Sequence, residues 1–195
     1  VIATIVNYAC HPTTLAWDNR LISPDYIGAM REVIQSHTQT PCLFLQGASG
    51  DLAPAEQYSG DPAVADKNGR QLGYAALSAL EAMLPPGTQL CYSGTMESGA
   101  ALGTWERFNY QTPNSLSAKL VEVSLQLKQL PKADEIEKEW NGCEDRVLKE
   151  RLSRKLAIRR ALGDGDMARM PLWVWRLGDS ILVGQPNEAY PELGM

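Results

Sequence analysis

Long apolar runs, an excess of positive charge and closely spaced cysteines are all missing from this sequence. No apolar run approaches the roughly 20 residues that span a bilayer, so we expect no transmembrane segment. The 18 lysines and arginines are outnumbered by 23 aspartates and glutamates, which gives a formal net charge of -5. Proteins that bind nucleic acids usually carry a basic excess, so we expect no nucleic-acid partner.

The four cysteines are too far apart for a structural zinc site and too few for a disulfide scaffold. What is present is an ordinary globular composition, with 44% apolar residues in a chain of 195. This length fits one domain, or one large piece of a bigger one. Because the chain opens inside the apolar run VIATIVNYA, we interpret residues 1–195 as a single-domain fragment of a larger catalytic domain.

Strand and helix patterns alternate in the first half of the sequence. Residues 2–9 form a short apolar run rich in β-branched residues, and a helical pattern follows, with Ser23 as its expected N-cap. The apolar run 42–46 predicts a second strand, and residues 69–84 place apolar side chains on one helical face. This repetition predicts an α/β fold with a mixed, largely parallel sheet and flanking helices.

The second half is less regular. The pattern of residues 88–96 is typical of a strand. Residues 99–114 are expected to be a long connection that either packs against the rest of the protein or serves as a binding flap. Residues 121–128 alternate with period two, which is typical of a half-exposed antiparallel strand. A charged helical region from 133 to 162 precedes a hairpin expected to turn on Gly178 and Asp179.

Polar residues follow three of the predicted strands. One of only two histidines, His11, comes after the first strand, a Gly47 to Asp51 loop follows the second, and Glu188 follows the last. Because ligands bind at the carboxyl ends of strands in open α/β sheets, we expect these residues to share one cleft. A neutral imidazole and a carboxylate are typical ligands of catalytic zinc, so His11 and Glu188 are the candidate metal ligands.

Three segments in this order carry a family resemblance: NYACHPTTL with LISPDYIG, then FLQGASGDLAP, then LGDSILVGQPNEAYPELG. Together they resemble the N-terminal catalytic domain of the neutral/alkaline non-lysosomal ceramidases, zinc-dependent amidases that cut the N-acyl bond of ceramide. The resemblance implies an amphipathic amide such as ceramide as the substrate, and a secreted or periplasmic location. It leaves the acyl length, the head group and the oligomeric state open.

The resemblance also implies which residues hold the metal. The zinc of this family is bound by two histidines, a glutamate and a tyrosine, and His11 and Glu188 match one histidine and the glutamate. Asn187 stands where glycine is usual. The remaining histidine and the tyrosine have no match here, so we expect them to lie outside this fragment and expect the fragment itself to be inactive.

One segment departs from the family pattern. Its hexapeptide Gly-Asp-Val-Ser-Pro-Asn, whose serine has been proposed as a nucleophile, reads Gly50-Asp51-Leu52-Ala53-Pro54-Ala55 here. We therefore expect metal-bound water to be the nucleophile. Ser49, Gly50 and Asp51 are expected to contribute at most backbone or substrate contacts to catalysis.

Two alternatives stay open at this point. One is a metal-independent serine hydrolase that uses Ser49, although GASGD is not a G-x-S-x-G nucleophile elbow. The other is a non-catalytic relative that keeps the fold to bind a lipid or a carbohydrate, which the two alanines at 53 and 55 favour.

Overall fold

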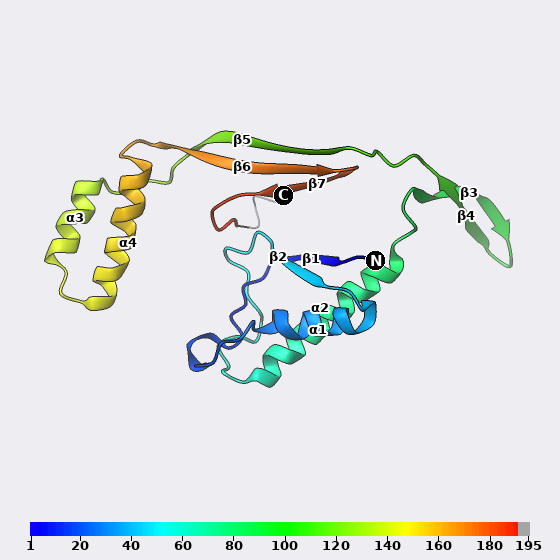
Figure 1. The fold of residues 1–195 in the computed structure, drawn as a ribbon, viewed down its shortest axis with the longest axis horizontal. Helices are drawn as coiled ribbons and strands as arrows, with labels where there is room; N and C mark the ends of the chain where they lie inside the picture. Colours follow the sequence, from blue (N-terminus) through cyan, green and yellow to red (C-terminus); the bar gives the residue numbers. More distant parts are fainter. Residues whose placement is uncertain (191–195) are drawn as a thin grey trace. The chain divides into compact units, whose positions relative to one another are not determined.

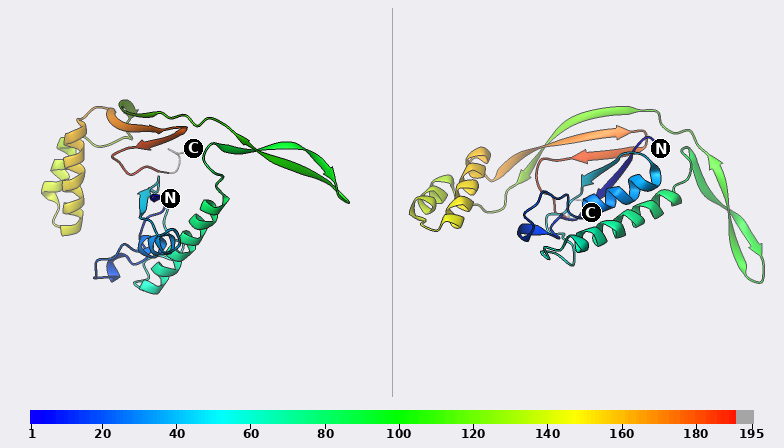
Figure 2. Two further views of the ribbon diagram at one scale, coloured as in Figure 1. Left: turned by 45° about the vertical axis from the view of Figure 1, so that its right-hand side comes forward. Right: turned by 60° about the horizontal axis from the view of Figure 1, so that its bottom comes forward.

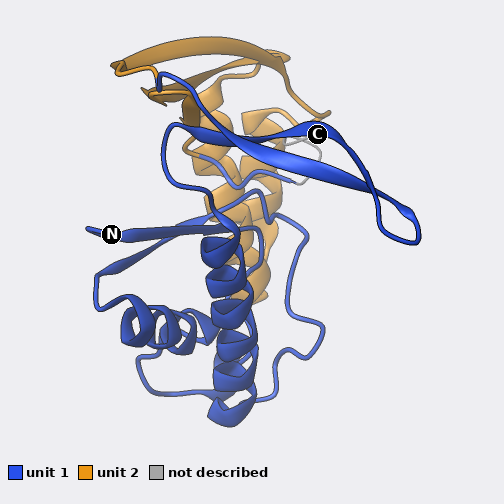
Figure 3. Ribbon diagram, turned by 90° about the vertical axis from the view of Figure 1, so that its right-hand side faces the viewer, with its two compact units in different colours: residues 1–112, 187–195 blue, residues 113–186 orange. Residues whose placement is uncertain are grey.

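A computed structural model describes residues 1–190, which divide into two compact units (Figures 1 and 3). Unit 1 comprises residues 1–112 together with the segment that begins at Asn187, and unit 2 comprises residues 113–186. The expected single domain within a larger catalytic domain stays a prediction.

Unit 1 begins with the predicted strand, helix, strand and helix. Strands β1 (Thr4–Tyr8) and β2 (Cys42–Gln46) pair in parallel, from Thr4 opposite Cys42 to Tyr8 opposite Gln46. Helix α1 (Tyr26–Thr38) connects the two strands, and α2 (Pro62–Ala82) follows β2. The chain also forms a short 3-10 helix, Ala16–Asp18, in the loop that precedes α1. The parallel pair confirms the α/β pattern of the first half.

Apolar side chains of α1 and β2 form the core of unit 1. Met30, Ile34 and Cys42 are almost fully buried, and side chains of α2 pack against them. The two helices lie side by side in Figure 1. They approach closely because α2 presents glycine to α1: a Cβ atom at Gly69 would lie 2.8 Å from the Cβ of Ala29.

The N-cap of helix α1 lies two residues later than the predicted one. Its N-cap is Asp25, whose carboxylate accepts hydrogen bonds from the amides of Tyr26, at 2.7 Å, and Leu15, at 2.9 Å. Ser23 instead accepts a hydrogen bond from the Asp25 amide through its hydroxyl, at 3.0 Å. The prediction of Ser23 as the cap is therefore wrong, because the buried aspartate satisfies the first free amide of the helix.

The connection expected at 99–114 contains a strand. Strand β4 (Ala101–Asn109) pairs antiparallel with β3 (Thr88–Glu97), and a bulge interrupts the register between Tyr92 and Gly94. The pair forms the twisted two-stranded ribbon seen in Figure 2. The loop prediction fails over this range because cross-strand pairs such as Tyr92 with Trp105, which meet edge to face, stabilise extended backbone.

Unit 2 contains an antiparallel sheet of three strands in the order β5, β6, β7. These are β5 (Leu116–Gln126), β6 (Met167–Leu177) and β7 (Ser180–Gly184). The turn between β6 and β7 contains Gly178 at φ 67°, a conformation that suits glycine, and this confirms the predicted hairpin.

The prediction of a largely parallel sheet is wrong. Within residues 1–190 only β1 and β2 pair in parallel. Strands β3 and β4 pair antiparallel, and so do β5 with β6 and β6 with β7. A parallel pair needs a crossover that returns the chain to the same end of the sheet, and α1 supplies it only once. The later strands reverse through short turns or through a helical hairpin, so their directions alternate.

That helical hairpin consists of α3 (Ala133–Gly142) and α4 (Arg146–Leu162). The charged helical region expected at 133–162 is thus two helices with a break after Gly142. Ile136 of α3 packs against Leu152 and Leu156 of α4, and all three side chains are almost fully buried. None of the helices within residues 1–190 has the length and apolar character needed to cross a membrane.

Candidate functional site

His11 lies three residues beyond the end of β1, and the loop after β2 holds it from two sides. The backbone amide of His11 donates a hydrogen bond to the carbonyl oxygen of Leu52 at 2.8 Å. The ring atom Nδ1 of His11 lies 3.0 Å from the same oxygen. Pro12 restricts the backbone of His11 to extended conformations, which keeps the ring at the strand end. Main-chain and ring contacts with one carbonyl therefore fix the orientation of the imidazole.

The second predicted ligand lies directly against this ring. Nε2 of His11 contacts Oε1 of Glu188, although 177 positions separate the two residues in the sequence. The backbone amide of Gly50 donates to the carbonyl of Ala189 at 2.8 Å and so attaches the Glu188 segment to the loop after β2. The structure thus brings His11, Glu188 and the loop of residues 47–51 together within unit 1, and a cleft lined by them stays a prediction.

The segment around Glu188 is not helical as far as residue 190. The sequence NEAYPELGM, residues 187–195, predicts the opening of a helix with Glu188 in its first turn. This prediction is wrong for residues 187–190, and the rest of the segment lies outside the described residues. Its backbone instead runs beside the loop at Gly50, where a Cβ atom would come within 2.9 Å of the Tyr190 ring.

The protonation of the pair follows from its neighbours. A carbonyl oxygen only accepts, so the contact with Leu52 requires a proton on Nδ1 of His11. In the neutral ring Nε2 then carries a lone pair that faces the Glu188 carboxylate, which is also an acceptor. Two facing acceptors need a cation between them, either a proton or a metal ion. In the absence of a metal, the hydrogen bond to Glu188 and then that to Leu52 raise the pKa of His11.

These residues fit a zinc ion in their chemistry. Imidazole nitrogen and carboxylate oxygen are both common zinc ligands, and the other ring nitrogen of a zinc-bound histidine usually donates to a carbonyl or carboxylate, as His11 does to Leu52. Within residues 1–190 no group of three or more histidine, cysteine, aspartate or glutamate side chains is placed to share an ion. The neighbouring Cys10 is a poor thiolate ligand, because burial raises its pKa.

The loop that includes Ser49, Gly50 and Asp51 mainly holds His11 and Glu188 in position, because most of its polar groups already have partners within the protein. Ser49 is only 2% exposed, and its hydroxyl accepts a hydrogen bond from Nε2 of Gln46 at 2.6 Å. The Gly50 amide is engaged by Ala189, whereas the Asp51 side chain is exposed. The Ser49 carbonyl also accepts from the amide of Leu52 at 2.9 Å, which closes the turn that presents the Leu52 carbonyl to His11.

Sequence reasoning missed a cavity of about 460 Å³ in unit 1. Tyr8, Cys10 and Tyr26 line one part of it, and Ala55 lies in the loop that lines another. Helix α2 contributes a polar wall that includes Lys67, Asn68 and Gln71. The feature of the sequence that could have indicated this cavity is the polar face of α2. The sequence analysis used only the apolar face of that helix. The cavity adjoins the site in sequence, since Cys10 precedes His11.

No family model, curated protein or solved structure matches this chain. The geometry of the His11 and Glu188 pair and the three sequence motifs are therefore the basis for a functional proposal.

Proposed function

We propose that this chain belongs to a zinc-dependent hydrolase of N-acyl amide bonds, similar to a ceramidase, in which His11 and Glu188 bind the metal. The observation that supports this proposal most is the contact between Nε2 of His11 and the Glu188 carboxylate while Nδ1 is held by the Leu52 carbonyl. That arrangement places a nitrogen lone pair directly against a carboxylate oxygen. The further ligands are proposed to come from residues outside this chain.

Each residue of the pair has a defined task in this proposal. His11 offers Nε2 because Leu52 keeps its proton on Nδ1, and Glu188 offers a carboxylate that the Gly50 and Ala189 hydrogen bond holds in place. His11 and Glu188 would hold the zinc ion, which would supply Lewis-acid chemistry: polarisation of a carbonyl group and activation of a water molecule. No protein nucleophile is required, which agrees with alanine at position 53.

The substrate proposed is an amphipathic amide such as ceramide. The cavity lined by Tyr8, Cys10 and Tyr26 combines aromatic walls with polar groups of α2, which suits a molecule with an apolar chain and a polar head. Alanine at positions 53 and 55 removes a hydroxyl and an amide that the family uses, so the head group is expected to differ from that of ceramide itself.

The alternatives receive less support from the geometry. A serine hydrolase needs a base within hydrogen-bonding reach of its nucleophile, yet the buried Ser49 hydroxyl accepts from an amide, that of Gln46. A non-catalytic binding protein remains the second candidate, and Ala53 and Ala55 are the residues that favour it.

Metal content and amidase activity of the complete natural protein test the proposal. We expect His11→Ala to lower bound zinc and to abolish hydrolysis of a fluorogenic N-acyl substrate, and chelation of the wild type to abolish it as well. His37→Ala removes the only other histidine and is the matched control, expected to keep both zinc and activity. Ser49→Ala is expected to keep most activity. Activity that survives chelation and is lost in Ser49→Ala would establish the serine hydrolase instead.

A further inference from the structure

Helix α4 is strongly basic in a chain whose net charge is negative. Its 17 residues, RVLKERLSRKLAIRRAL, contain seven lysines and arginines and one glutamate. Part of this charge is neutralised locally: Arg160 contacts Glu137 at 2.8 Å, and Arg154 contacts Glu150 at 2.9 Å. Arg151 and Lys155 make no ion pair within residues 1–190, so the helix keeps uncompensated positive charge.

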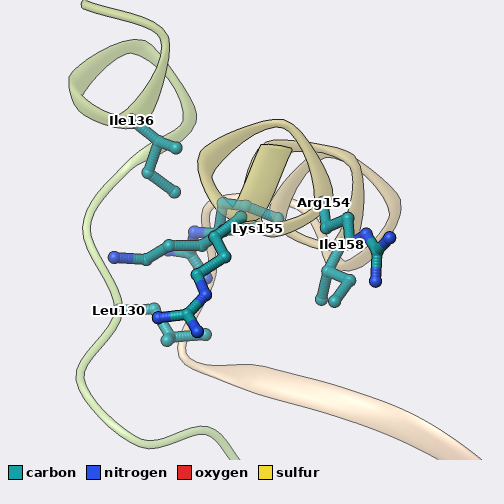
Figure 4. A pocket seen from close by; sticks show the side chains of 7 residues that line it. Leu130, Ile136, Arg154, Lys155 and Ile158 are labelled. Atoms are coloured by element: carbon teal, nitrogen blue, oxygen red, sulfur yellow. The ribbon is translucent and has the colours of Figure 1, made fainter. Parts of the chain in front are cut away.

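The uncompensated charge lines a cavity of about 330 Å³ within unit 2. Figure 4 shows Leu130 and Ile136 on one side of this cavity and α4 on the other, with Lys155 extending between them. Four cationic and three aliphatic side chains line the cavity, and no acidic one does: Arg151, Arg154, Lys155, Arg159, Leu130, Ile136 and Ile158. A concave, apolar surface with convergent cations is complementary to an anion that carries an apolar group.

The arginine at the base of this cavity is held in place by the chain. Arg159 is only 5% exposed, and one of its terminal nitrogens donates to the carbonyl of Gly165 at 3.1 Å. Its Nε lies 3.2 Å from Asp164 without making a hydrogen bond, so one buried donor of the guanidinium stays unsatisfied. The contacts with Gly165 and Asp164 fix the position of this guanidinium in the lining of the cavity.

We propose that this cavity binds a phosphate monoester with an aliphatic substituent. Such a phosphate carries a charge between -1.5 and -2 near neutral pH, and arginine matches its geometry through paired hydrogen bonds. Arg151 and Lys155 neutralise the charge, Arg159 adds a fixed guanidinium to the lining, and Leu130 and Ile158 cover the aliphatic part. The phosphate comes either from a soluble ester or from the head group of a phosphatidic acid, and the experiment separates these two sources.

Titration calorimetry of the 195-residue chain with n-butyl phosphate and with inorganic phosphate tests the proposal. We expect butyl phosphate to bind about tenfold more tightly, because part of a four-carbon chain leaves water. Arg151→Gln combined with Lys155→Gln is expected to weaken binding at least about tenfold. Lys149→Gln makes the same type of change on α4 outside the cavity and is expected to leave the affinity unchanged. Circular dichroism checks that each variant is folded.

Ile158→Ala separates the two halves of the site. Ile158 is 59% exposed, so its truncation is expected to be tolerated and to reduce the preference for butyl phosphate over phosphate. Flotation with vesicles of phosphatidylcholine, with and without phosphatidic acid, tests the lipid source: binding that needs phosphatidic acid, Arg151 and Lys155 supports a head group as the ligand. Failure of both butyl phosphate and these vesicles to bind, or equal weakening by Lys149→Gln, would overturn the proposal.

Discussion

Leu52 serves the candidate site through its main chain. Its carbonyl oxygen accepts from both the backbone and the ring of His11, so it decides which ring nitrogen faces Glu188. Every residue type offers the same carbonyl, so a motif based on side-chain identity does not detect this contribution. The Ser49 carbonyl and the Gly50 amide also serve the site through the main chain: the first accepts from the Leu52 amide, and the second donates to the Ala189 carbonyl.

Zinc affinity of this chain is predicted to be weak. His11 and Glu188 supply two ligands, whereas a catalytic zinc site usually has three from the protein in fixed geometry. Calorimetric titration with zinc is expected to show no tight one-to-one binding, and His11→Ala is expected to abolish whatever weak binding is seen. Tight binding that requires both residues would mean that the site is complete within this chain.

A buried cap at Asp25 is predicted to stabilise unit 1. Asp25→Ala removes acceptors from the amides of Leu15 and Tyr26 and places alanine at φ 54°, so we expect a loss of about 2 to 3 kcal/mol in the free energy of unfolding. The control is Asp61→Ala, which removes the exposed cap of α2 and is expected to cost about 1 kcal/mol. Urea unfolding followed by circular dichroism measures both; equal losses would contradict the importance of burial.

At the scale of the elements, a stripe of small residues sets the distance between α1 and α2. Ala65, Gly69 and Gly73 are the buried residues of α2, spaced one helical turn apart. At Gly73 a Cβ atom would lie 2.8 Å from the Cβ of Val33, so the backbones approach more closely than larger side chains allow. The packing of the two helices therefore depends on the absence of side chains as much as on apolar ones.

Alanine is predicted to have opposite effects at two helical glycines. Gly69→Ala forces α2 away from Ala29 and Met30, and we expect overpacking to destabilise the protein by about 1 to 3 kcal/mol despite better helix propensity. At Gly142 of α3 a Cβ atom meets nothing within 4 Å, so Gly142→Ala is expected to stabilise by up to about 1 kcal/mol. Thermal unfolding of the two variants checks the signs; stabilisation by Gly69→Ala would contradict the close helix contact.

Local sequence patterns were sufficient to predict the helices and strands in the first half of the chain. The run CLFLQ coincides with β2, and the contact of His11 with Glu188 agrees with the expectation of one cleft. The sequence did not predict β4, because GTWERF is charged and aromatic without clear alternation and is extended through its pairing with β3. The prediction of parallel strands failed for a similar reason, because pairing between distant segments decides the direction of each strand. The cavity beside α4 was missed because its cations resembled a solvated face.

At the scale of the whole molecule, apolar side chains on sheet edges stay open to solvent. Within the described residues β7 pairs only with β6, and its Ile181 and Val183 are 63% and 59% exposed. An exposed apolar edge strand offers unpaired backbone groups to another chain. We therefore expect the isolated chain to self-associate.

A charge on that edge is predicted to reduce the association. Val183→Lys places an ammonium group on β7, which opposes edge-to-edge pairing, and sedimentation velocity at several concentrations is expected to show a lower average mass than for the wild type. Val147→Lys adds the same group at an equally exposed position, 58%, on α4, and is expected to change the mass little. A similar reduction by both variants would indicate a general charge effect.

Unit 1 is discontinuous in sequence: the chain leaves it after residue 112, forms unit 2, and returns to it at Asn187. During synthesis His11 leaves the ribosome before unit 2, whereas Glu188 follows only after all of unit 2 has been translated. Unit 2 is continuous and has its own buried cluster, so it is able to fold before translation ends. Folding of the insertion shortens the flexible loop that separates His11 from Glu188 and so lowers the entropy cost of joining them. Within unit 1 the pair thus forms late, and a nascent chain stalled before residue 187 carries the imidazole without its carboxylate.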